Sequence, residues 1–240
     1  NSLGFWEARF FNNNMMIYIP EGPFKMGTDI ESAFPKERPS HRVQLSAYWI
    51  SKYEVTFDQY DYYCEETRRD KPYDEKWGRG MRPVVNISWF DASEYCEWLS
   101  IKTGLSFRLP TEAEWEKAAK GNTQFLYPWG HDVPTDRHAN FNYHVGKTSE
   151  VGKYPSGISP YGLYDMGGNV REWCLDWYDE LYYKSSPAEN PSGPVSGDSR
   201  IIRGGGWGYD ESFLRTTDRN RWIPEDSSNE IGFRIVLEGK

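Results

Sequence analysis

The second half of the chain, from Gly121 onward, has almost no helical or strand periodicity, and this limits the folds that it can adopt. Long irregular stretches are uncommon in a compact domain unless buried side chains or bound cations hold them in place. Suitable side chains are present, because 17% of the residues are aromatic, which is too many for a disordered chain. No linker-like segment separates the two halves, so we expect one mixed α+β domain over residues 1–240.

Regular elements are predicted mainly in the first half. Gly104 and Gly121 can end the second and third of the helices expected there. Short strands are predicted at residues 16–19, 43–50, 200–203 and 232–237. Capping-box patterns mark the three helix starts: Thr56 with Gln59, Ser88 with Asp91, and Thr111 with Glu114.

Composition excludes several classes of protein. Acidic residues outnumber basic ones by 36 to 28, the net charge is -8, and no basic cluster occurs, so nucleic acid is not an expected partner. The mean hydropathy of -0.81 and the lack of a long apolar run predict no direct membrane insertion. Cys64, Cys96 and Cys174 are too few for a disulfide framework, and we interpret them as small buried residues.

Several phrases of the sequence occur in an order typical of one family. The phrases are GPFKMG at 22–27, KYEVT at 52–56, RLPTEAEW at 108–115, YGLYDMGGNVREW at 161–173, RGGGW at 203–207 and IGFR at 231–234. Together they resemble the formylglycine-generating-enzyme (sulfatase-modifying factor) domain family over nearly the whole chain. The resemblance implies an elaborated C-type lectin fold of the formylglycine-generating-enzyme type, with much irregular structure.

The family's copper-dependent oxidases need two residues that this chain lacks. In those enzymes two cysteines shortly after the Arg-Gly-Gly-Ser strand bind Cu(I), because soft thiolates suit this ion. The matching positions here are Tyr209 and Leu214, and no cysteine follows Cys174. We therefore expect no copper and no oxidase activity.

The family's iron-dependent sulfoxide synthases use histidines. This chain has four, His41, His131, His138 and His144, and none forms an HxH or HxxxH pair. We therefore expect no catalytic residues. The alternative that stays open is a metal-dependent oxidase or synthase that uses His138 and His144, or a maturation factor of the same family.

The resemblance also implies a structural calcium site in the irregular half. Its ligands would be the Asp165 and Glu172 carboxylates with the backbone oxygens of Gly168 and Val170. Carboxylate and carbonyl oxygens are the ligands that Ca²⁺ prefers, and a bound cation would order a glycine-rich loop. The alternative is a metal-free loop in which Glu172 accepts hydrogen bonds from backbone amides.

The segment from about 207 to 231 has the composition of a binding surface, because rigid aromatics alternate with short polar and charged residues. It resembles, without a gap, the variable region of retroelement-diversified C-type lectin proteins, in particular the TvpA-like surface variable proteins. This implies that Arg215, Arg219 and Pro224 anchor the backbone. It also implies ligand-binding positions at Tyr209, Asp210, Ser212, Phe213, Asp218, Asn220, Arg221, Trp222 and Ile223, and all of these except Asp218 are expected to share one exposed face.

The function implied is that of a non-catalytic, receptor-type binding protein, diversified by a retroelement. We expect a monomer on the bacterial cell surface, as a lipoprotein whose leader has been removed, with a protein or a cell-surface carbohydrate as ligand. Gly206 replaces the usual Ser, and Trp222 and Glu230 cannot arise by changing only the first two bases of an asparagine codon. A relative that no longer varies, or an ordinary family member with overgrown loops, is therefore the alternative.

Overall fold

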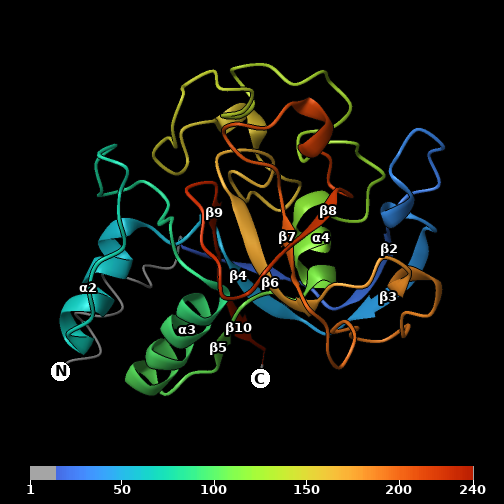
Figure 1. Cartoon of the computed structure of the whole chain (residues 1–240). Coiled ribbons are helices and arrows are strands. Elements are labelled where there is room, and N and C mark those ends of the chain that lie inside the picture. Colours follow the sequence, from blue (N-terminus) through green and yellow to red (C-terminus); the bar gives the residue numbers. More distant parts are fainter. Residues whose placement is uncertain (1–14, 240) are drawn as a thin grey trace.

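The computed structural model describes residues 15–239 (Figure 1). The α-helices are α2 (Phe57–Thr67), α3 (Trp89–Thr103) and α4 (Glu112–Lys120), and the 3-10 turns are η1 (Pro35–Glu37), η2 (Pro155–Gly157), η3 (Tyr182–Lys184) and η4 (Glu211–Phe213). The strands are β1 (Met16–Ile19), β2 (Gly22–Met26), β3 (His41–Leu45), β4 (Tyr48–Ser51), β5 (Phe107–Arg108), β6 (Arg171–Trp177), β7 (Arg200–Arg203), β8 (Arg219–Trp222), β9 (Ile231–Gly232) and β10 (Val236–Glu238).

Each predicted capping box begins a helix. Thr56, Ser88 and Thr111 are the N-caps of α2, α3 and α4, and each side chain accepts a hydrogen bond from the backbone N–H three residues later. Gly104 ends α3 with a φ of 71°, a left-handed conformation that suits glycine.

The strands of residues 15–239 form two four-stranded sheets and one hairpin. The orders are β1-β4-β10-β5, β2-β3 and β8-β7-β6-β9, with β6 and β9 parallel. The strand predicted over 43–50 is wrong as a single element, because β3 pairs with β2 whereas β4 pairs with β1 and β10. The strand predicted over 232–237 is interrupted, because Arg234 turns inward to Glu172.

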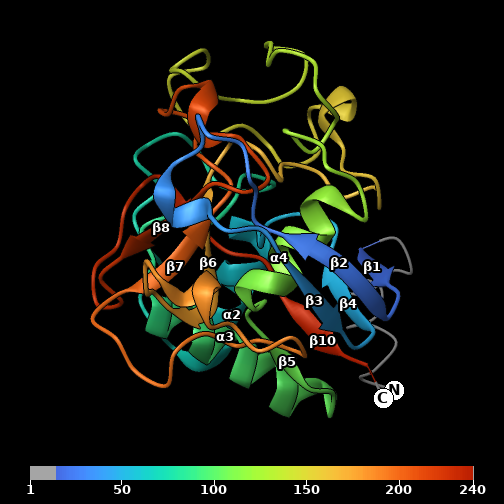
Figure 2. The ribbon, with the colours of Figure 1, turned by 90° about the vertical axis from the view of Figure 1, so that its right-hand side faces the viewer.

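The apolar core lies on both sides of the sheets. One cluster packs α2 and α3 against residues of β6, β7 and β9, and a second packs α4 against β1 to β4 and β10. α4 lies behind β6 and β7, while α2 and α3 cover the other side (Figures 1 and 2). Both sheets therefore share one continuous scaffold.

The irregular residues between α4 and β6 gather at one end of the molecule, beside η4 (Figures 1 and 2). A third apolar cluster there joins Leu214, the residue after η4, to Tyr127, Ala139 and Phe141. Buried aromatic side chains thus order a region without periodicity, as its composition predicts. Within residues 15–239, no helix is long and apolar enough to cross a membrane.

Candidate functional site

The segment between β7 and β9 is attached to the scaffold by side chains that point inward. Arg215 donates to one carboxylate oxygen of Glu37 in η1, and Thr217 donates to the other, each at 2.6 Å. Thr216 donates to the backbone oxygen of Phe125 at 2.9 Å. Because Glu37 is fully buried, these bonds fix the backbone of the segment on both sides of Thr216.

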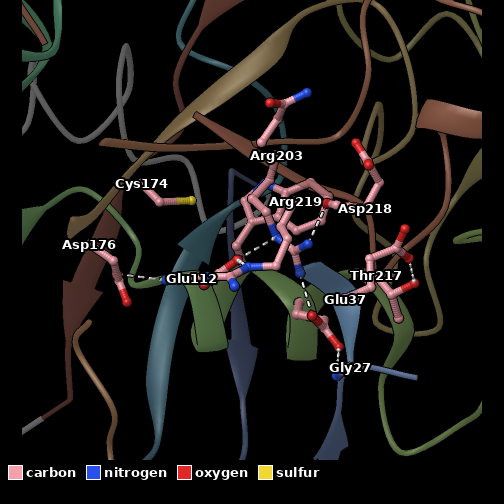
Figure 3. Close-up of polar contacts among 12 residues, drawn as sticks. Gly27, Glu37, Glu112, Cys174, Asp176, Arg203, Thr217, Asp218 and Arg219 are labelled. Carbon is pink, nitrogen blue, oxygen red and sulfur yellow. Dashed lines mark hydrogen bonds and ion pairs between the residues drawn. The ribbon is translucent and has the colours of Figure 1, made fainter. Parts of the chain in front are cut away.

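Arg219 of β8 makes a second attachment, shown in Figure 3. Its guanidinium donates to both carboxylate oxygens of Glu112, each at 2.8 Å, and both side chains are buried. Arg203 of β7 lies beside this pair, bonds to Glu116, and has its Nε 3.7 Å from Glu112. Two guanidinium groups therefore neutralise two carboxylates on α4. The contacts of Arg215 and Arg219 agree with their expected anchoring role.

Asp176 of β6 connects the same network to the start of α4. Its carboxylate accepts a hydrogen bond from the backbone N–H of Glu112 at 2.8 Å (Figure 3). Burial and the charge of Glu112 raise the pKa of Asp176 to about 8. Burial and the charge of Asp176 also raise the pKa of the Cys174 thiol well above its usual value. Cys174 is therefore a buried thiol, as predicted, and Cys64 and Cys96 are also buried and free.

The predicted ligand-binding residues differ in exposure and form two groups. Tyr209, Ser212 and Phe213 are half-buried and Asp210 is exposed; we call these the η4 group. Asn220 is half-buried, while Arg221, Trp222 and Ile223 are exposed; we call these the β8 group. Trp222 is 37% exposed and Ile223 is 51% exposed.

The two groups lie at opposite ends of β7. The pairing register places Trp222 beside Arg200 at the start of β7, whereas the η4 group follows the end of this strand. The exposed face that the resemblance implies would therefore be built from two separate segments. Asp218, predicted as a ligand-binding position, is fully buried, and its carboxylate lies 3.6 Å from Lys36 Nζ.

The aromatic rings of the η4 group cover a buried guanidinium. The Arg171 guanidinium carbon lies 3.8 Å from the ring centroid of Tyr209 and 5.1 Å from that of Phe213. The two rings contact each other with centroids 5.2 Å apart. Arg171 belongs to the VREW phrase, but nothing in its sequence spacing indicates that these rings would stack on it.

The two positions that hold copper-binding cysteines in the oxidases are occupied here by an aromatic and an aliphatic side chain. The Tyr209 ring lies against Arg171, and Leu214 is fully buried in the third apolar cluster. Of the two histidines of the alternative interpretation, His138 stacks on Trp129 and His144 lies 3.8 Å from Asp136. Among the described contacts, neither histidine meets a cysteine that could serve as a further metal ligand.

Three buried carboxylates meet around one guanidinium at the predicted calcium site. Glu172 accepts hydrogen bonds from Arg234 at 2.5 and 2.6 Å and from the Trp115 indole at 2.7 Å. Asp165 accepts from the backbone N–H of Gly152 at 2.8 Å. The third carboxylate, Glu54, was not predicted as a site residue although it lies in the KYEVT phrase.

The charge of this cluster suits a cation. Burial raises the pKa of Asp165 to about 6, and burial with the charges of Asp165 and Glu172 raises that of Glu54 well above its usual value. One guanidinium, from Arg234, faces three carboxylates, so a dication would remove the excess negative charge. Gly168 has a φ of 114°, which allows the sharp turn between Asp165 and Val170. Both Glu172 oxygens are bonded to Arg234, and within residues 15–239 no group of three or more His, Cys, Asp or Glu side chains is arranged to hold a metal ion. Calcium at this site stays a prediction.

The fold and this arrangement can now be compared with known proteins. Residues 5–239 match the family model "Sulfatase-modifying factor enzyme 1-like domain". The chain belongs to this family. The resemblance of its sequence phrases to the formylglycine-generating-enzyme domains is thus confirmed, and so is the expected fold.

Curated relatives carry several names. The chain is 36% identical over 244 residues to "Serine/threonine-protein kinase pkn1" of Chlamydia pneumoniae, a match that covers 92% of this chain and 37% of that protein. It therefore spans only about a third of the length of that relative. It is also 31% identical to the "Formylglycine-generating enzyme" of Thermomonospora curvata, with 93% of each chain covered.

Two solved structures are similar over nearly the whole chain. PvdO from Pseudomonas aeruginosa has a TM-score of 0.83 and 31% identity, with 93% of this chain and 94% of that chain covered. Treponema denticola variable protein 1 has a TM-score of 0.79 and 29% identity, with 93% and 95% covered. The second match supports the link to the TvpA-like proteins within the family.

Proposed function

We propose that the chain is a non-catalytic ligand-binding domain that presents the η4 group and the β8 group on a rigid scaffold. The observation that carries this proposal is the alternation within residues 208–223. Arg215 and Arg219 point inward to buried carboxylates, while Asp210, Arg221 and Trp222 point to solvent. Such side chains can change without loss of fold, which a variable binding surface requires.

Three further observations support the proposal. The variable protein of Treponema denticola has a similar structure at 29% identity. Tyr209 and Leu214 also occupy the positions of the oxidase cysteines, and neither side chain is a ligand for Cu(I). A pocket of ≈ 240 Å³ beside η4, lined by Ile30, Tyr127 and Ser212 among others, offers room for a protruding group of a ligand.

The partner that we propose is a protein or a cell-surface carbohydrate, since a broad aromatic and polar surface suits a macromolecule. We also propose retroelement diversification of the segment, structural calcium at Asp165 and Glu172, and a location on the bacterial surface. The gene sequence upstream of the codon for Asn1 tests the location: a signal peptide that ends in a lipidated cysteine supports it, and a start codon there removes it.

The binding test uses the double variant Trp222→Ala, Ile223→Ala, with Ile101→Ala as the matched control. Ile101 is an exposed apolar residue of α3, far along the chain from both groups. Unmodified protein, double variant and control are applied to a glycan array and to an array of bacterial surface proteins. We expect a specific signal that the double variant loses and the control keeps. A signal that all three proteins share, or none at all, contradicts the proposal.

An oxidase remains the second candidate, because formylglycine-generating enzymes are among the relatives at 31% identity. Incubation with Cu(I) and a cysteine-containing peptide under air measures this activity directly. Turnover above a metal-free blank, or a stoichiometric redox metal in the purified protein by elemental analysis, favours the enzyme. We expect neither.

A further inference from the structure

One edge of the Arg171 guanidinium lacks a hydrogen-bond partner. Arg171 is only 1% exposed, and its Nε and Nη2 atoms are buried and donate to no described residue. These two N–H groups form the edge that binds a carboxylate through two parallel hydrogen bonds. A buried donor without a partner is costly, so a native protein that keeps two of them on one edge has a reason to do so.

A buried acid interacts electrostatically with Arg171. Both carboxylate oxygens of Asp218 are buried and accept no hydrogen bond from the residues that the structure describes. The Asp218 charge interacts with those of Lys36 and Arg171, and its closest cation is Lys36 Nζ at 3.6 Å. Glu37, the other nearby acid, already binds Arg215 and Thr217. The surroundings of Arg171 therefore include an acid whose described cation contact is the 3.6 Å ion pair with Lys36, and no hydrogen-bonded counter-ion among the described residues.

The cover over these groups is made by residues of the proposed binding surface. Tyr209 and Phe213 lie on the Arg171 guanidinium, and Phe34 lies 6.3 Å from Phe213, centroid to centroid. Both covering rings are half-buried; Tyr209 lies just before η4, and Phe213 is its last residue. Neither ring bonds to Arg215 or Arg219, and the described side-chain tie on Tyr209 is its hydrogen bond with Glu230. A ligand that reaches Arg171 must therefore displace these two rings, and not the anchors.

We propose that Arg171 and Asp218 form a recognition site for a carboxylate that has an N–H donor on the adjacent carbon. The carboxylate binds the Nε and Nη2 edge of Arg171, and the N–H group donates to Asp218. Tyr209 and Phe213 move aside and then pack on the rest of the ligand. This site rests on the proposed function, in that it takes residues 208–223 as the ligand-facing segment, and it adds the chemistry of the group recognised.

Two sources share this chemistry: a free amino acid, whose donor is an ammonium, and the last residue of a peptide, whose donor is an amide. Three matched probes separate them, namely L-leucine, N-acetyl-L-leucine and L-leucinamide. The first two carry the carboxylate and the third does not. If leucine gives no response, the other common amino acids follow with their acetyl and amide forms, because the covering rings select the side chain.

Binding is measured as a rise in the unfolding midpoint with ligand concentration, and as a shift of the Arg171 Nε–H signal in ¹⁵N NMR. Arg171→Lys keeps the charge but removes the two-donor edge, and we expect Kd to rise by about tenfold or more. Arg200→Lys is the matched control, since Arg200 also stacks on aromatic rings and has a buried Nε without a described partner. Asp218→Asn should weaken leucine binding more than that of N-acetyl-leucine, because an ammonium loses its counter-ion.

A response to leucine or to N-acetyl-leucine that leucinamide does not give supports the site, and the stronger of the two identifies the source. Equal binding of the amide, unchanged binding by Arg171→Lys, or no response from any probe overturns it. The wild-type ligand series decides the matter even if a variant fails to fold. The Trp222→Ala, Ile223→Ala double variant separates the two proposals, because it should lose macromolecular binding and keep amino-acid binding.

Discussion

The buried pair between Arg219 and Glu112 allows a quantitative test of how the binding segment is held. Arg219→Ala removes two hydrogen bonds of 2.8 Å to Glu112 and two longer ones, of 3.2 Å, to the backbone oxygens of Lys36 and Asp179. It leaves the Glu112 carboxylate buried without its main partner. Arg221→Ala, two residues along the same strand, is the matched control, because Arg221 is exposed and stacks on Tyr178 at 5.0 Å.

Breaking a buried ion pair by removing one partner costs about 3–5 kcal/mol. Arg203 Nε remains 3.7 Å from Glu112 and offsets part of the charge, so we expect the lower value, about 3 kcal/mol. For a chain of this size that is a fall of about 6–12 °C in the unfolding midpoint. The loss of an exposed cation–π contact in Arg221→Ala is about 0.5–1 kcal/mol.

Urea unfolding followed by tryptophan fluorescence measures both variants. Adding Glu112→Gln to Arg219→Ala should recover part of the stability, because it removes the uncompensated charge. If Arg219→Ala loses no more free energy of unfolding than Arg221→Ala, the pair does not hold the segment, and the anchoring argument is wrong.

Three further predictions concern stability. Burial raises the pKa of Asp176 to about 8, so the folded state keeps a proton that the unfolded state releases near pH 4. The free energy of unfolding should therefore fall by about 1.4 kcal/mol per pH unit between about pH 4 and pH 8. Asp176→Asn should reduce this slope, as measured by urea unfolding at a series of pH values. If calcium binds at Asp165 and Glu172, excess chelator should lower the unfolding midpoint of the wild type, and Asp165→Ala should no longer respond; a midpoint indifferent to chelator counts against the site. Trp222→Ala and Ile223→Ala should each lower the free energy of unfolding by less than Arg219→Ala does, since both side chains are partly exposed. A loss as large as that of Arg219→Ala in urea unfolding would mean that they are core residues.

The helices could be predicted because their signals are local. The side chains of Thr56, Ser88 and Thr111 each bond a backbone group three residues away, so a short stretch of sequence contains the whole interaction. The family phrases add the overall fold, and with it the place of the predicted calcium ligands and of the proposed binding segment. The two strands β1 and β7 were predicted at their observed bounds.

The central strand β6 and the edge strand β8 were missed for a different reason. β6 is buried on both faces, so its apolar and polar residues do not alternate. In β8 the buried position is occupied by the charged Arg219, so the alternation of apolar and polar residues that identifies a strand is absent. The cluster of Glu54, Asp165 and Glu172 and the stacking of Tyr209 on Arg171 join residues far apart in the chain. Only the folded arrangement brings such charges and rings together, so the spacing of residues in the sequence does not predict these contacts.

The sequence separation of the anchors has a consequence for how the domain folds. The bond between Arg215 and Glu37 closes a loop of 178 residues, and that between Arg219 and Glu112 closes one of 107. Contacts of such long range form late and slowly, because chain entropy must be lost before they are made. During synthesis, residues 208–223 therefore acquire their order only after nearly all of the domain has been assembled around them. The partner recognition that we propose for this segment would thus be restricted to completely folded molecules.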